Sequence, residues 1–185
     1  MTTNRRAGLA LITGGIAILG VLALHPTGRE AAGGGYGMST IVHAVAILAE
    51  LTVLLGALGL TVHLRAARDT ALAAFVTYAA ATMALIIAAV AAGWIDPSVA
   101  ATLNRSFATV GFGLAAIAVI LWSVAMWRTR FSRTLAIFGT AFGAFTLAGL
   151  MLGAGLTLHG FGGVVMLAFT VWVAWAGMAL KGQAG

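Results

Sequence analysis

The chain has 185 residues, of which 62% are hydrophobic and only 8% are charged. A water-soluble domain has roughly 25% charged residues, so this composition indicates an integral membrane protein with no hydrophilic block for a separate soluble domain. Cysteine is absent, which excludes disulfides, thiolate metal sites and iron–sulfur clusters. The formal charge of +6 comes from short basic clusters beside apolar runs, a pattern that indicates membrane orientation and not nucleic-acid binding.

Six apolar runs are long enough to cross a bilayer, which takes about 20 residues. The first follows a basic flank, as a signal peptide does, but it is longer than the usual apolar core of about 7–15 residues, so we expect it to be retained as a helix. The fifth and sixth runs are separated by glycines instead of charges. The fold prediction is one all-α domain over residues 1–185, an integral membrane bundle of about six transmembrane helices with spans at 7–24, 40–64, 71–94, 107–127, 135–153 and 156–180.

The basic residues predict the orientation of these spans. Of the ten Lys and Arg residues, only Arg29 and Arg105 fall on one side. The positive-inside rule then predicts that both termini are cytoplasmic, in a cell membrane of the bacterial inner-membrane type. The remaining basic residues all fall on the cytoplasmic side: Arg5, Arg6, Arg65, Arg68, Arg128, Arg130, Arg133 and Lys181.

Local signals add details to this bundle. The pair Asp96-Pro97 has the form of a helix N-cap followed by proline in the first turn. Gly139 and Gly143 have the GxxxG spacing that lets helices approach closely, which we expect within one chain more than between two. The tryptophans lie mostly near the predicted span ends, where anchoring in the membrane interface is the ordinary interpretation.

Glu50 is the single charged side chain deep in a predicted span. At about 100° per residue, His43 and Glu50 differ by about 700°, so they share a stripe and lie roughly 10 Å apart along the helix axis. His63, at the other end of the same span, points nearly the opposite way. A buried carboxyl is either neutral or close to a hydrogen-bond donor, because desolvation disfavours its charged form. The candidate partners are Thr13, Thr77, Tyr78, Thr82 and Thr140.

Three of the four histidines are predicted at the extracytoplasmic face. His25 follows the first span, His43 lies in the first turns of the second, and His159 opens the sixth. The glycines around His159 clear space either for a flat ligand such as a porphyrin or simply for close helix packing; they are Gly160, Gly162 and Gly163.

This histidine cluster favours a cofactor or metal site. In the preferred hypothesis, His43 and His159 hold haem b, Glu50 tunes the site, and quinol or a periplasmic redox carrier exchanges electrons with it. Alternatively, His25, His43 and His159 hold a copper, zinc or iron ion, with Glu50 or a methionine completing the shell.

Two other classes of function remain open. Glu50 could bind and release a proton in a small proton-coupled transporter or channel component, with His43 as the outer relay. The chain could also be a non-catalytic subunit that packs in a homo-oligomer or a larger membrane complex through its glycine-rich helices. Whether it is an enzyme stays open, although no nucleotide-binding loop or nucleophile elbow is present.

Overall fold

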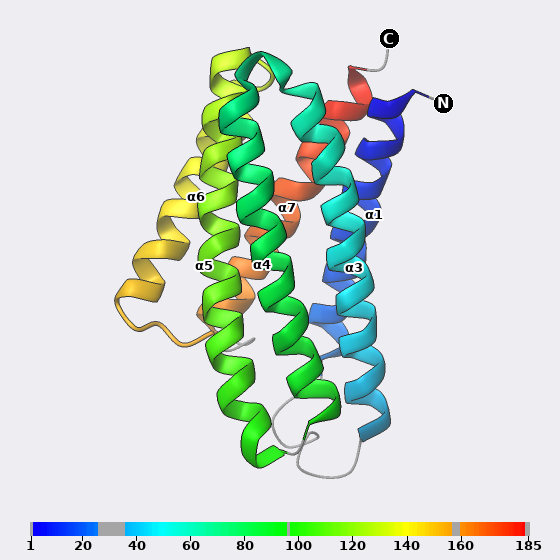
Figure 1. Cartoon of the computed structure of the whole chain (residues 1–185), viewed down its shortest axis with the longest axis vertical. Coiled ribbons are helices and arrows are strands. Elements are labelled where there is room, and N and C mark those ends of the chain that lie inside the picture. The colour runs from blue at the N-terminus through cyan, green and yellow to red at the C-terminus, as the bar shows by residue number, and fades with distance from the viewer. Residues whose placement is uncertain (1, 26–35, 96, 157–159, 184–185) are drawn as a thin grey trace.

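The computed structural model describes residues 2–25, 36–95, 97–156 and 160–183, and these residues form an all-α bundle (Figure 1). Six of its helices are long and apolar enough to cross a membrane, which confirms the predicted all-α fold with six long apolar helices. The two ends of the chain lie at the same end of the bundle (Figure 1). The elements are α1 (Thr3–Leu24), α3 (Tyr36–His63), the short 3-10 helix η1 (Arg65–Ala67), α4 (Arg68–Trp94), α5 (Pro97–Thr129), α6 (Arg133–Met151) and α7 (Phe161–Gly182).

The helix bounds differ from the prediction mainly at the starts of α5 and α7. α5 begins at Pro97, where the Asp96-Pro97 signal placed a helix start, and therefore projects well beyond the apolar run predicted to begin at residue 107. The predicted start of the last span at residue 156 is wrong, because α7 begins at Phe161 after the N-cap Gly160. Glycine is a poor helix former, so the glycines near this point delay the helix although the apolar run continues.

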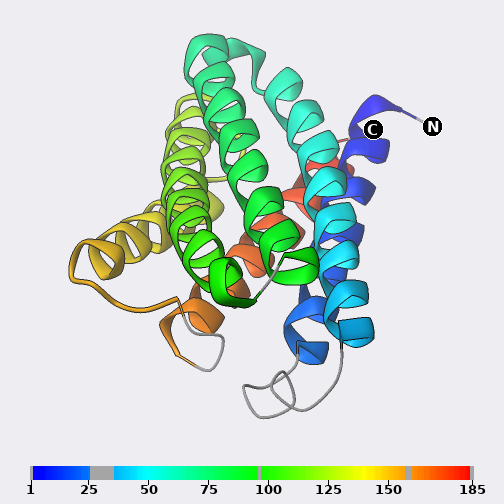
Figure 2. The same cartoon turned by 60° about the horizontal axis from the view of Figure 1, so that its bottom comes forward.

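The helices are arranged as a ring. α1 packs against α3 and α7, α3 packs against α4, and α5 lies between α4 and α6. The contact between α6 and α7, which closes the ring, is much sparser than the other contacts between neighbours. Both views show α6 standing out from the rest of the bundle (Figures 1 and 2). This contact between α6 and α7, called the α6–α7 seam below, is therefore the least tightly closed part of the ring of helices.

The outer surface of the bundle is apolar, as a lipid-facing surface must be. On α3, the stripe that includes Ala49 and Val53 is buried, whereas Leu48 and Leu55 on the opposite side are 64% and 68% exposed. Large exposed apolar side chains recur on the other five long helices. A water-soluble monomer rarely exposes such continuous apolar surface, so these six helices are best solvated by a lipid bilayer.

Glycines allow the closest helix approaches. A Cβ atom on Gly8 of α1 would lie 2.6 Å from the backbone oxygen of Gly177 on α7, so no larger residue fits there without a backbone shift. On α6, Gly139 faces Ser123 and Trp172, while a Cβ on Gly143 would lie 2.8 Å from a backbone oxygen of α5. The predicted GxxxG pair thus packs inside the chain.

Aromatic rings fill the interior. Trp122 of α5 and Trp172 of α7 are each 1% exposed and stack with their ring centroids 6.0 Å apart. The prediction of interfacial anchoring is wrong for these two, because position along a span does not reveal which face of the helix carries the ring. Trp94 and Trp127, each 51% exposed near helix ends, do have the surroundings of anchors.

Candidate functional site

Two histidines meet at the end of the bundle opposite the chain termini. His25 follows the last residue of α1, and His43 lies at the start of the third turn of α3. Their ring centroids are 5.3 Å apart and their planes cross at 76°, an edge-to-face contact. His43 is only 8% exposed, although histidine is a polar residue. The structure therefore places the His25 ring next to the His43 ring.

The backbone of α4 supports His43. Gly93, close to the end of α4, lies so near that a Cβ there would be 3.3 Å from the Cβ of His43. One turn earlier on α3, the Thr40 hydroxyl donates a hydrogen bond of 2.9 Å to the Gly93 carbonyl oxygen. These contacts fix the start of α3 against α4 and so orient the His43 side chain.

The other two histidines have different positions relative to this pair. His159 lies outside the described residues, so the predicted meeting of His43 and His159 stays a prediction. His63 lies at the opposite end of α3, where its Nδ1 is 3.2 Å from the Asn4 amide nitrogen and its ring contacts Phe131. It is thus separate from the His25–His43 pair, as the helical geometry predicts.

Glu50 has a hydrogen-bond partner on the next helix. The Tyr78 hydroxyl of α4 donates to Glu50 Oε2 at 2.9 Å. Tyr78 was one of five candidate partners from the sequence, and it is fully buried. Its ring lies 5.5 Å from that of Trp122 and 5.9 Å from that of Phe169, so the phenol is held from two further helices. No described residue donates a hydrogen bond to Glu50 Oε1.

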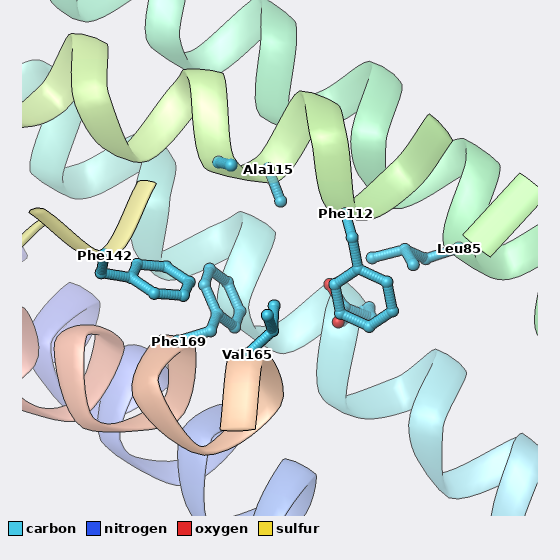
Figure 3. A pocket seen from close by; sticks show the side chains of 8 residues that line it. Leu85, Phe112, Ala115, Phe142, Val165 and Phe169 are labelled. Carbon is cyan, nitrogen blue, oxygen red and sulfur yellow. The ribbon is translucent and has the colours of Figure 1, made fainter. Parts of the chain in front are cut away.

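A small pocket adjoins this carboxyl. It has space for about one water molecule. Figure 3 shows Phe112 of α5, Phe142 of α6 and Phe169 of α7 converging on it from three helices. Among the described residues that line it, Glu50 is the only polar one, and the lining also includes Leu85, Ala115, Ala116 and Val165.

Two buried polar atoms in the interior were not anticipated from the sequence. Ser123 Oγ and Trp172 Nε1 have no hydrogen-bond partner among the described residues, and both face Gly139. By contrast, Trp122 Nε1 donates to Thr61 Oγ1 at 3.1 Å. Nothing local to Ser123 or Trp172 signals this arrangement, because it depends on how α5, α6 and α7 meet.

The described residues contain no group of three or more His, Cys, Asp or Glu side chains close enough to hold one metal ion. The predicted set of His25, His43 and His159 extends beyond those residues, so this finding does not test it. Comparison with known protein families, with curated proteins and with solved structures finds no match to the chain. The geometry of the chain itself therefore carries the evidence for its function.

Proposed function

We propose that this multi-pass membrane protein binds a transition-metal ion at its extracytoplasmic face, through His25 and His43 with His159 as the third ligand. The observation that carries the proposal is the edge-to-face contact between His25 and His43. The eight basic residues that are predicted to be cytoplasmic lie at the start of α1, around the α3–α4 and α5–α6 connections and at the end of α7. These segments are at the end of the bundle that holds the chain termini (Figure 1). By the positive-inside rule, the histidine pair then faces the extracytoplasmic side.

The ring geometry agrees with a shared ion. A metal bound to an imidazole nitrogen at about 2 Å lies about 3 Å from the ring centroid, and two such rings at a tetrahedral angle have centroids about 5 Å apart. The observed separation is 5.3 Å. A haem between His25 and His43 would hold the two rings apart on opposite sides of the porphyrin, so their direct contact favours an ion over haem at this pair.

The chemistry of the ligands limits which metal ions can bind. Neutral imidazoles suit zinc, copper and iron, whereas calcium and magnesium prefer oxygen ligands. The chain has no cysteine, so thiolate cannot contribute. With copper or iron the site would serve electron exchange with quinol or a periplasmic carrier, and with zinc it would bind the ion without redox chemistry.

Metal analysis of the purified protein tests the proposal. We expect about one equivalent of copper, zinc or iron after loading and a loss of at least about tenfold in affinity in His25→Ala and in His43→Ala. His63→Ala is the matched control, because this histidine lies on the same helix as His43 but at the other end of the bundle. The His63 variant should keep the metal.

Other outcomes of this experiment separate the alternatives. Unchanged affinity in both the His25 and His43 variants would contradict the proposal. A Soret absorption band that disappears in His43→Ala and His159→Ala but persists in His25→Ala would instead establish the haem b hypothesis. Circular dichroism of each variant checks that the helices are intact.

A further inference from the structure

Glu50 places a carboxyl group inside an apolar helix that is long enough to span a membrane. It lies within the apolar span of α3, and its surroundings come from α4, α5, α6 and α7. An ionisable side chain at membrane depth is costly, so it marks a functional site by default. The Tyr78 hydroxyl fixes one carboxyl oxygen, Oε2, and leaves Oε1 for a further interaction.

The pocket beside Glu50 limits what can bind at Oε1. A hard metal cation takes about six oxygen ligands, and the pocket lining offers one carboxyl group. A fixed water molecule needs about two to four polar partners, and seven of the eight lining residues are apolar. A larger ligand exceeds the space. A proton is the occupant that needs only a single oxygen and almost no volume.

None of the described residues that bond to Glu50 or line its pocket carries an opposite charge to compensate the carboxylate. Tyr78 of α4 is the titratable group that faces Glu50, and the lining residues of α5, α6 and α7 are all uncharged. On the side of α1, Gly14 packs against Val53 of α3 and brings no charge. Proton binding therefore converts Glu50 from an uncompensated ion to a neutral group, which makes its surroundings sensitive to protonation.

The α6–α7 seam offers a route to the pocket. Phe142 lines the pocket from α6, and Val165 and Phe169 line it from α7, the two neighbouring helices with the sparsest mutual contact. Phe142 and Phe169 have ring centroids 6.5 Å apart across this seam. Small movements of these side chains would connect the pocket to the outside of the ring.

We propose that Glu50 is a reversible proton-binding site, with Oε1 as the protonated atom and the α6–α7 seam as the route of access. On binding, a hydronium ion that reaches the pocket transfers one proton to Oε1 and leaves as water; on release, water takes the proton back. Tyr78 keeps its own proton and holds the carboxyl group in place. This site is independent of the metal proposed at His25 and His43.

Infrared titration of the protein in lipid tests the proton site directly. We expect a protonated-carboxyl band that is present in acid and disappears as the pH is raised, because a reversible site must release its proton. The band should be missing in Glu50→Gln and altered in frequency in Glu50→Asp. Asp69→Asn is the control, because Asp69 is an exposed carboxyl at the start of α4 and its loss should leave the band unchanged.

Two infrared results would overturn the proposal. A Glu50 band that persists unchanged over the whole pH range would show a permanently neutral, purely structural carboxyl. The absence of the band at every pH would show a carboxylate that never takes a proton. The histidine variants should titrate like the natural chain, so failure of the metal proposal does not affect this result.

Labelling with a lipid-soluble carbodiimide, which reacts with protonated carboxyl groups in apolar surroundings, tests the route. Mass spectrometry should locate the label on Glu50, with labelling that falls as the pH rises. Phe142→Ala removes a pocket wall at the α6–α7 seam and should accelerate labelling by about tenfold. Phe138→Ala is the matched control, since this ring lies one turn earlier on α6 and packs on Trp175 outside the pocket lining. A labelling rate in Phe142→Ala equal to that of the natural chain would exclude the route between α6 and α7 at the pocket.

Discussion

In the middle of the bundle, Tyr78, Trp122 and Trp172 are each at most 1% exposed and pack ring against ring, whereas at the end opposite the termini His25 and His43 meet edge to face. The middle is held by buried side chains from all six long helices, whose volumes must fit one another. The histidine end joins the end of α1 to α3 and α4.

Because of this difference, substitutions in the two regions should have different effects. Protein interiors are packed to the density of organic crystals, so a change of volume in the middle cannot be absorbed without cost. A change at the histidine end removes fewer buried contacts but alters the positions of potential ligands. Substitutions in the middle should therefore reduce stability most, and substitutions at the histidine end should mainly reduce binding.

The largest effect is expected at Gly139. A side chain there would collide with Ser123 Oγ and with the Trp172 indole, both of which are buried. Gly139→Val should therefore lower the free energy of unfolding by about 3 kcal/mol, seen as a lower thermal midpoint in detergent. Gly20→Val is the control, because a Cβ at Gly20 of α1 meets nothing within 4 Å. Equal losses in the two variants would mean that the tight packing around Gly139 is not what limits stability.

A smaller loss is expected when the hydrogen bond to Glu50 is removed. Tyr78→Phe keeps the ring that packs on Trp122 and Phe169 but loses the hydroxyl that donates to Glu50 Oε2. The cost should be about 1 kcal/mol in thermal or denaturant unfolding. Thr77→Ala should be nearly neutral, since its hydroxyl bonds to the Ala73 carbonyl of its own helix. A Tyr78→Phe variant as stable as the natural chain would show that the bond contributes nothing net.

The fold could be predicted from the sequence because a membrane span is a local property. About 20 consecutive apolar residues identify a helix without knowledge of its neighbours. The predicted start of α7 was wrong because it relied on this local property alone: the apolar run includes Gly160, whereas the helix begins at Phe161. The separation of His43 from His63 is likewise local, because the two residues lie 20 positions apart on one helix.

The site depends on contacts that no single helix encodes. Tyr78 could be named among five candidate partners of Glu50, but only the packing of α4 against α3 selects it. The burial of Trp122 and Trp172 follows from the order of helices around the ring, which hydropathy does not reveal. The approach of His25 to His43 depends on where the chain leaves α1. The sequence thus supplied the chemical groups but not their pairing.

The smallest effect on stability is expected at Gly93, on the histidine end. An added Cβ would lie 3.3 Å from the Cβ of His43, so the neighbour must shift by a few tenths of an ångström. Gly93→Ala should cost less than about 1 kcal/mol of stability, but it should weaken the proposed metal binding by about tenfold, because metal ligands tolerate displacements of only about 0.2 Å. Gly113→Ala is the matched control, since its nearest contact, the Leu150 side chain at 3.7 Å, is an ordinary one. Metal titration of both variants measures the difference, and equal affinities would show that the backbone of α4 does not position His43 for binding.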